Sequence, residues 1–118
     1  MEVVDKAGKT TTYEAPHIII ATGGRAKQLP NLPIDGEKII EYRKAMSLKK
    51  QPKSMVIVGA GAIGVEFAYF YNAIGTNVTI VEFMEQGLVP REDKDISKEL
   101  GKVYKLSLIH ISEPTRPY

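Results

Sequence analysis

One stretch of the chain, from Ser54 to Phe83, limits the possible folds more than any other. A run of small apolar residues, "SMVIV", leads into glycines at positions 59, 61 and 64, and then a helical pattern and a second apolar run follow. A strand, a glycine turn, a helix and a strand within about 30 residues predict a βαβ unit with parallel strands and a right-handed crossover. The sequence therefore predicts an α/β fold class with a Rossmann-like unit.

The remaining elements follow from hydrophobic periodicity and from the turn residues. Within the central unit we expect a buried strand at 55–58, a helix at 62–74 ended by Gly75, and a strand from 77 that runs to Glu82. The helix should pack through one face, made by Ile63, Phe67, Phe70 and Ile74. Elsewhere we expect a hairpin at 3–13, a buried strand at 17–22, a short helix at 41–48 and a longer helix within 91–104.

The three glycines fit the spacing of a dinucleotide-binding turn, and each has a mechanical reason. Gly59 would permit a tight turn out of the strand, and Gly61 would let the backbone approach a pyrophosphate. Gly64 would let the helix pack close to the strand. The pyrophosphate would lie at the N-terminus of the helix, where free N–H groups and the helix dipole favour an anion.

An acidic residue, Glu82, follows Gly64 by 18 positions, at the end of the next strand. An acid at this place can accept hydrogen bonds from the ribose hydroxyls of the adenosine, and its charge would repel a 2′-phosphate. The pattern therefore favours NAD over NADP. The alternative is a glycine-rich turn without a ligand and an acid that only ends a strand.

Composition excludes several classes of function. The 118 residues are 43% apolar and 25% charged, with a formal charge of +2 and no clustered basic patch, which disfavours a nucleic-acid partner. No apolar run approaches the roughly 18 residues that cross a bilayer, and the first residues do not resemble a signal peptide. We expect a soluble cytoplasmic protein that does not associate with a membrane. The chain has no cysteine, which rules out disulfides and thiolate metal sites within it. Its only two histidines, His17 and His110, are far apart in sequence and do not predict a zinc site.

A second motif, "IIIATGG" at residues 18–24, precedes the βαβ unit. Alone it is typical of a core strand followed by a glycine turn. Together with "QPKSMVIVGAGAIGVEFA", "NAIGTNVTIVE" and "PREDKDISKEL", it resembles the pyridine nucleotide–disulfide oxidoreductases, and most of all their dihydrolipoyl dehydrogenase branch. The resemblance runs from about residue 10 to 105. Other reductases of the same architecture (NADH oxidases, mercuric reductases, glutathione-type reductases) and a non-catalytic NAD-binding module are the alternatives.

The resemblance implies two cofactors, FAD and NAD, and a role for particular residues. The backbone of Ala21, Thr22 and Gly23 would approach FAD. Ile63 and Glu66 would lie near the nicotinamide and the flavin, although Glu66 could also be an ordinary solvent-facing glutamate. The NAD set implied in this way is Gly59, Gly61, Ile63, Gly64, Glu66 and Glu82.

The reaction implied by the resemblance passes electrons from dihydrolipoamide through a disulfide and FAD to NAD. The implied partners are the dihydrolipoamide groups of 2-oxo acid dehydrogenase or glycine cleavage complexes, and the full-length protein would be a homodimer. The chain lacks the first glycine motif, the redox cysteines and the histidine base of that family. We therefore expect an internal fragment that is inactive alone and contains no catalytic residue.

The same comparison predicts the domain organisation. Residues 1–26 would end an FAD-binding domain, 27–54 would be a connector, and 55–105 would begin an NAD-binding domain, so that both domains are incomplete. Residues 106–118, "LSLIHISEPTRPY", depart from the family pattern. They resemble the translation of an adapter used in sequencing libraries, and we expect a foreign tail. A divergent native C-terminus is the alternative.

Overall fold

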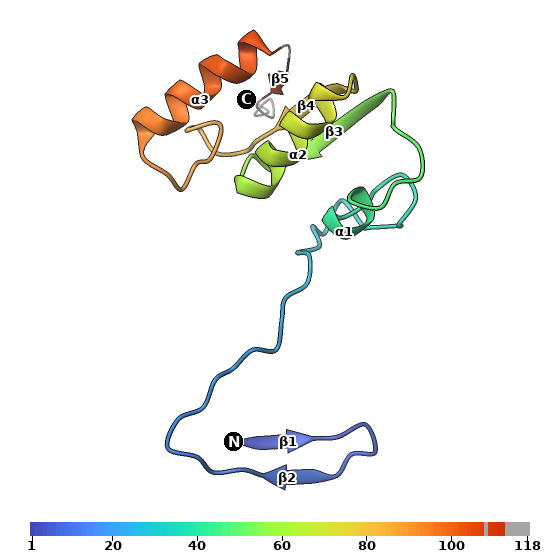
Figure 1. Cartoon of the computed structure of the whole chain (residues 1–118), viewed down its shortest axis with the longest axis vertical. Helices are drawn as coiled ribbons and strands as arrows, with labels where there is room; N and C mark the ends of the chain where they lie inside the picture. Colours follow the sequence, from blue (N-terminus) through green and yellow to red (C-terminus); the bar gives the residue numbers. More distant parts are fainter. Residues whose placement is uncertain (108, 113–118) are drawn as a thin grey trace. The chain divides into compact units, whose positions relative to one another are not determined.

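The computed structural model describes residues 1–107 and 109–112, and it divides the chain into two compact units, Met1–Pro33 and Ile34–Tyr118 (Figure 1). The predicted domain boundaries at residues 26, 54 and 105 concern the family's domains, and they stay predictions.

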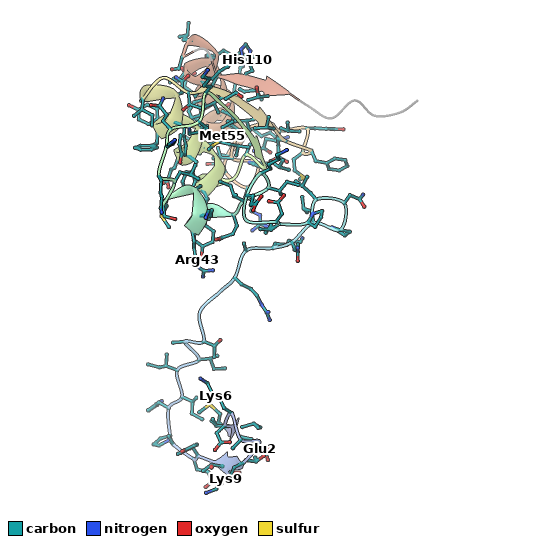
Figure 2. All side chains as sticks on the ribbon, turned by 90° about the vertical axis from the view of Figure 1, so that its right-hand side faces the viewer. Glu2, Lys6, Lys9, Arg43, Met55 and His110 are labelled. Atoms are coloured by element: carbon teal, nitrogen blue, oxygen red, sulfur yellow. The ribbon has the colours of Figure 1, made fainter. Side chains whose placement is uncertain are left out.

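The first unit begins with the predicted hairpin. Strands β1 (Glu2–Val4) and β2 (Thr10–Thr12) pair antiparallel, with Val3 opposite Thr11. The turn is fixed by Asp5, whose Oδ1 accepts hydrogen bonds from the N–H groups of Ala7 at 2.8 Å and Lys9 at 2.9 Å. All of these residues are exposed, and the labelled side chains of Glu2, Lys6 and Lys9 lie around the hairpin (Figure 2).

The predicted buried strand at 17–22 is wrong for this structure. These residues form no strand, and Ile19 and Ile20 are 89% and 81% exposed. A strand needs neighbours for its backbone hydrogen bonds, and a buried one needs side chains on both faces. Among the described residues no strand pairs with this run, so its apolar composition alone does not make it a strand.

The second unit contains the predicted βαβ arrangement within a three-stranded sheet. The strands are β3 (Ser54–Val58), β4 (Asn77–Val81) and β5 (His110–Ser112), in the order β3-β4-β5. Both neighbouring pairs are parallel, and Ile57, Ile80 and Ile111 lie side by side across the sheet. The predicted strand from residue 77 to Glu82 corresponds to β4, which ends one residue earlier, at Val81.

In its described part this unit has three helices: α1 (Tyr42–Ala45), α2 (Ala62–Ala73) and α3 (Lys94–Leu106). The side chain of Glu41 caps α1 by accepting from the N–H groups of Arg43 and Lys44. Helix α2 connects β3 to β4, and α3 connects β4 to β5 (Figure 1). Gly75, with φ 93, follows the end of α2 in the left-handed conformation expected of a residue that terminates a helix. These helices confirm the predicted ones.

One face of the sheet packs with the helices to form the core. Val78 and Ile80 of β4 are completely buried, and Met55 and Ile57 of β3 pack against the same cluster. The label of Met55 in Figure 2 marks this packed part of the unit. On the opposite face of β3, Val56 and Val58 are 65% and 53% exposed. The prediction of a buried strand is therefore correct for one face of β3 and wrong for the other. Alternation along the strand decides which side chains are covered.

Helix α2 packs mainly through a different face from the predicted one. Its buried residues are Val65, Ala68 and Tyr71. Of the four predicted residues, Phe67 packs against the core, whereas Ile63, Phe70 and Ile74 are exposed. The helix is apolar on several sides, so periodicity gave no single face.

Part of the segment that departs from the family pattern belongs to the described residues. Leu106 is the last residue of α3, Ile109 is 3% exposed in the core, and His110–Ser112 form β5 beside β4. Residues 108 and 113–118 lie outside the described residues. A short β-forming run can pair with a sheet whatever its origin, so a foreign tail stays a prediction.

Tyr104 joins α3 to α2 and gives a test of this packing. Its buried hydroxyl donates a hydrogen bond to the carbonyl oxygen of Val65 at 2.7 Å. Burial raises the pKa of Tyr104, and the nearby Glu66 and Tyr69 raise it further. The neutral phenol is therefore favoured by folding. Its contribution to stability is fully present below the ordinary tyrosine pKa of about 10 and is lost as the pH rises through the higher folded value.

We predict that Tyr104→Phe lowers the free energy of unfolding at neutral pH by about 1 kcal/mol, because one buried hydrogen bond is lost. Urea unfolding at pH 7 and above pH 10 measures this, and the difference between the two proteins should shrink at the higher pH. Tyr69→Phe, at a side chain that is 63% exposed, is the control and should have no comparable effect. Equal stability of Tyr104→Phe and the unmodified chain at pH 7 would contradict the assignment.

Candidate functional site

The turn between β3 and α2 begins with a glycine that the backbone itself requires. Gly59 has φ 101, a conformation that other residues adopt only with strain. Its N–H donates to the carbonyl oxygen of Val81 at 2.8 Å, which extends the pairing of the two strands by one bond. Gly59 therefore lets the chain leave the sheet sharply.

The third glycine, Gly64, is required by packing. A Cβ atom built at this position would lie 3.2 Å from the carbonyl carbon of Gly59 and still nearer to its oxygen. Backbone atoms cannot move aside as a flexible side chain can. Gly64 thus lets the first turn of α2 sit directly against the turn, as the sequence predicts.

The middle glycine differs from the other two. Gly61 has φ −69 and ψ 178, which any residue can adopt, and a Cβ built there would meet nothing within 4 Å. In the described part of the chain, neither backbone conformation nor steric contact therefore requires glycine at this position. A glycine here leaves the backbone open to a group that approaches from outside.

Backbone donors converge on this open position. Gly61 is the N-cap of α2 and has no side chain to cap the helix. Within the described part of the chain, the N–H groups of Gly61, Ala62, Ile63 and Gly64 donate to no acceptor, and the first intrahelical bond comes from Val65. Unpaired N–H groups and the positive end of the helix dipole attract an anion.

The predicted acid lies directly against the turn. Glu82 is only 8% exposed, and its Oε2 accepts a hydrogen bond from the N–H of Ala60 at 2.7 Å. Its Oε1 accepts from the N–H of Met84 at 2.9 Å. A carboxylate has about four acceptor sites, so two remain. The structure therefore places Glu82 against the glycine turn at Ala60, between the first two glycines, and this N–H is a structural partner that the sequence did not predict.

The other predicted residues differ in their surroundings. Ile63 and Glu66 are exposed on the first two turns of α2, three positions apart and thus on neighbouring parts of one face. Ala21, Thr22 and Gly23 belong to the first unit, where all three are exposed and Gly23 has φ 77.

Sequence reasoning did not identify two residues around this turn. The N–H of Val89 donates to the carbonyl oxygen of Ala60 at 2.7 Å, and Val89 has φ 43. Ser97 of α3 is 3% exposed, and its hydroxyl donates to the carbonyl oxygens of Gln86 and Leu88. The nearest signal in the sequence is Pro90, which restricts the backbone conformation of Val89. It does not indicate that the N–H of Val89 bonds to Ala60.

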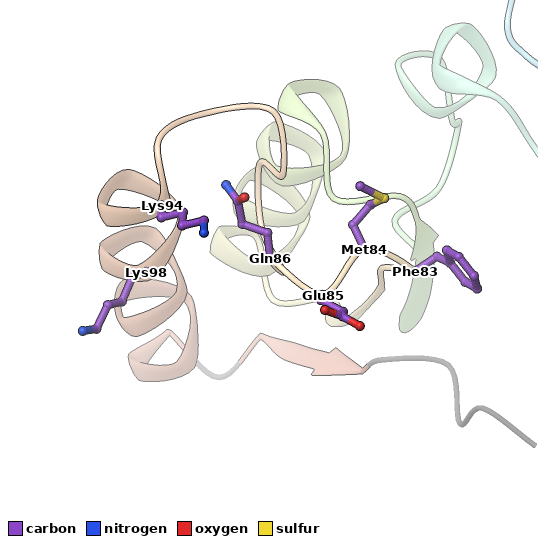
Figure 3. A pocket seen from close by; sticks show the side chains of 6 residues that line it. All are labelled: Phe83, Met84, Glu85, Gln86, Lys94 and Lys98. Atoms are coloured by element: carbon purple, nitrogen blue, oxygen red, sulfur yellow. The ribbon is translucent and has the colours of Figure 1, made fainter. Parts of the chain in front are cut away.

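An open hollow follows Glu82 along the chain. It is lined by the segment after β4 and by the first turns of α3 (Figure 3), namely by Phe83, Met84, Glu85, Gln86, Lys94 and Lys98. Its wall is mostly apolar, with the two lysines on one side. Among the described residues no group of three or more histidine, cysteine or acidic side chains could hold a metal ion. No helix in the described part is long and apolar enough to cross a membrane.

A parallel βαβ unit with open backbone donors at a glycine turn and an acid at the end of its second strand defines a dinucleotide-binding class of α/β protein. The chain belongs more particularly to the pyridine nucleotide–disulphide oxidoreductase family, whose model matches residues 1–116. This membership confirms the resemblance seen in the sequence, and the fold class is confirmed with it.

Individual relatives agree with this membership. The chain is 44% identical over 105 residues to the dihydrolipoyl dehydrogenase of Chlorobaculum parvum, covering 89% of this chain and 22% of that protein. It is 43% identical to the dihydrolipoyl dehydrogenase of Zymomonas mobilis, covering 94% and 24%. A leghemoglobin reductase of Glycine max is 44% identical over 80% of the chain and 18% of its own length. The chain thus spans about a quarter or less of these relatives.

A solved structure extends the likeness to three dimensions. The crystal structure of LpdA from Mycobacterium tuberculosis has a TM-score of 0.74 and 29% identity to this chain, and the match covers 95% of this chain and 24% of that one. The flavoprotein disulfide reductase RclA of Escherichia coli has a TM-score of 0.54 and 34% identity over 60% of this chain and 16% of its own.

The different demands on the glycines give a prediction about stability. Gly64→Ala should lower the free energy of unfolding by about 1–3 kcal/mol, because the added methyl group collides with the backbone of Gly59. Gly61→Ala should change it by less than about 0.5 kcal/mol, because the added methyl group meets only open space. Urea unfolding of both variants measures the difference. Equal effects of the two substitutions would contradict the assigned geometry.

Proposed function

We propose that this chain carries the NAD-binding βαβ unit of a flavoprotein oxidoreductase of the dihydrolipoyl dehydrogenase type. The observation that carries the proposal is the open backbone at Gly61, where four successive N–H groups donate to nothing in the described part of the chain. Two glycines are explained by the fold itself. The remaining glycine, Gly61, is explained by a ligand whose phosphates need the space that a side chain would take.

The residues around the turn suggest how NAD would be held. The pyrophosphate would lie over Gly61 at the N-terminus of α2, where the donors and the helix dipole favour its charge. The unused acceptor sites of Glu82 would take the adenosine ribose hydroxyls, and its carboxylate would repel a 2′-phosphate. Ile63 and Glu66, exposed on α2, would lie toward the nicotinamide and the flavin.

The whole-protein activity rests on the relatives named dihydrolipoyl dehydrogenase. In that proposal electrons pass from dihydrolipoamide through a disulfide and FAD to NAD, which accepts a hydride, and Ala21, Thr22 and Gly23 contribute to the FAD site. These 118 residues contain no cysteine, so the disulfide cannot come from them. We infer that the chain alone is inactive. Its full-length form would act in the cytoplasm as a homodimer with 2-oxo acid dehydrogenase or glycine cleavage complexes.

A second candidate is another reductase of the same architecture. The relatives include a leghemoglobin reductase at 44% identity, close to the value for the dihydrolipoyl dehydrogenases. The βαβ unit binds the nicotinamide cofactor in either case, so it does not distinguish the electron donors. Replacing the matching segment of the Chlorobaculum parvum enzyme with residues 10–105 of this chain tests what the two candidates share, a working nicotinamide site. Retained reduction of NAD by dihydrolipoamide supports the proposed NAD-binding unit, and a correctly folded, flavin-loaded but inactive chimera counts against it.

The NAD site is tested by titrating the chain with NAD in a calorimeter. We expect binding by the unmodified chain and at least tenfold weaker binding by Gly61→Ala, because the methyl group occupies the place of the phosphates. The unchanged stability predicted for Gly61→Ala separates this effect from unfolding. Unchanged NAD affinity in a folded Gly61→Ala variant would refute the proposed phosphate position.

The preference for NAD is tested by measuring both nucleotides. NAD should bind at least tenfold more tightly than NADP, because the Glu82 carboxylate repels the 2′-phosphate at short range. Glu82→Gln removes this charge and should lower the ratio of the NAD affinity to the NADP affinity. Circular dichroism checks that the variant keeps its secondary structure. A ratio that is the same in both proteins would remove the selective role from Glu82.

A further inference from the structure

The residue between the first two glycines is held at both of its backbone groups. Ala60 is completely buried. Its N–H donates to Glu82 Oε2 at 2.7 Å, and its carbonyl oxygen accepts from the N–H of Val89 at 2.7 Å. Both partners come from one segment, residues 82–89, which we call the turn clamp. The position of the open donors at Gly61 thus depends on residues outside the glycine motif.

The turn clamp is itself attached to α3. The hydroxyl of Ser97 donates to the carbonyl oxygen of Gln86 at 3.0 Å and also to that of Leu88. The side chain of Leu88 is 2% exposed in the core. The side-chain amide of Gln86 donates to the carbonyl oxygen of Glu92 at 2.7 Å, which joins the clamp to the residues just before α3. A chain of direct contacts therefore runs from α3 through the clamp to Ala60.

Val89 has an unusual backbone for its residue type. A β-branched residue with φ 43 lies in the left-handed region, which costs free energy and persists only where the surroundings hold it. Here its side chain packs against the core and its N–H is bonded to Ala60. Gly87, with φ 79, supplies the turn that precedes it at no such cost. The strained residue is the one whose N–H reaches the glycine turn.

We propose that Val89 and Ser97 are positioning residues for dinucleotide binding. They fix Ala60 and thereby keep the N–H groups of Gly61 to Gly64 aligned on a phosphate. Ser97, at 3% exposure, acts through the clamp and not by contact with a ligand. The inference rests on the proposed NAD site and adds the elements that preorganise it.

A matched pair of variants tests the role of Ser97 in the full 118-residue chain. Ser97→Ala removes a hydroxyl that donates to backbone carbonyls of the clamp. Tyr71→Phe removes one that donates to the carbonyl oxygen of Ala45 at 2.6 Å, which ties α2 to α1 instead. NAD titration should show about fivefold weaker binding for Ser97→Ala, the effect of one net hydrogen bond, and less than twofold change for Tyr71→Phe.

A second measurement separates positioning from general loss of stability. Amide hydrogen exchange without NAD should be faster at Ala60 in Ser97→Ala than in Tyr71→Phe, when both are compared at equal free energy of unfolding. Equal NAD affinities and equal exchange at Ala60 in the two variants would overturn the proposal. Failure of the unmodified chain to bind NAD would instead overturn the proposed NAD site, and the positioning role with it.

Variants at Val89 keep the proposal testable if Ser97→Ala does not fold. Val89→Gly keeps the N–H and accepts a positive φ, whereas Val89→Pro removes the N–H and cannot adopt this φ. Both lack the valine side chain. NAD affinity should stay within about threefold of the unmodified chain in Val89→Gly and fall at least tenfold in Val89→Pro. Equal affinity of the two variants would contradict a positioning role for the Val89 N–H.

Discussion

The contact of α2 with the end of β3 determines the rest of the second unit. The helix begins so close to the turn that Gly64 has no room for a side chain beside Gly59. This approach directs the unpaired N–H groups of the first helical turn toward the carboxyl end of the strand. The same helix contributes Val65, Ala68 and Tyr71 to the core. The core and the candidate site therefore have one geometric cause.

The glycine turn combines internal and external requirements. Gly59 and Gly64 serve the fold, through a positive φ and a close backbone contact, whereas Gly61 leaves space that the fold does not use. Glu82 joins the two kinds of requirement, because its carboxylate binds the N–H of Ala60 and retains acceptor sites for a ligand. A site built in this way is preorganised, since its donors and its acid are placed before the ligand arrives.

Much of this arrangement could be predicted from the sequence, and the exceptions have physical reasons. The glycine spacing, the helical period and the acid at position 82 are local signals, and they located the βαβ unit and its turn. The run at 18–20 misled because a strand depends on partners that composition does not reveal. The buried face of α2 was predicted correctly only at Phe67, because the helix is apolar on several sides.

The role of Val89 could not be predicted, since its bond to Ala60 joins residues 29 positions apart and leaves no periodic signal. The same holds for Ser97, whose hydroxyl is bonded to carbonyl groups of a loop. Such backbone contacts depend on the folded path of the chain and not on the identity of the acceptor residue. Local sequence patterns thus locate the glycine turn, whereas the contacts that Val89 and Ser97 make become visible only in the structure.

The most direct test of the central claim follows the backbone amides of the chain by nuclear magnetic resonance during titration with NAD. The account predicts that the largest saturable shifts occur at the N–H groups of Gly61, Ala62, Ile63 and Gly64, because these donors are unpaired in the described part of the free chain and would bind the pyrophosphate. Saturable binding that leaves these four amides unshifted would contradict it.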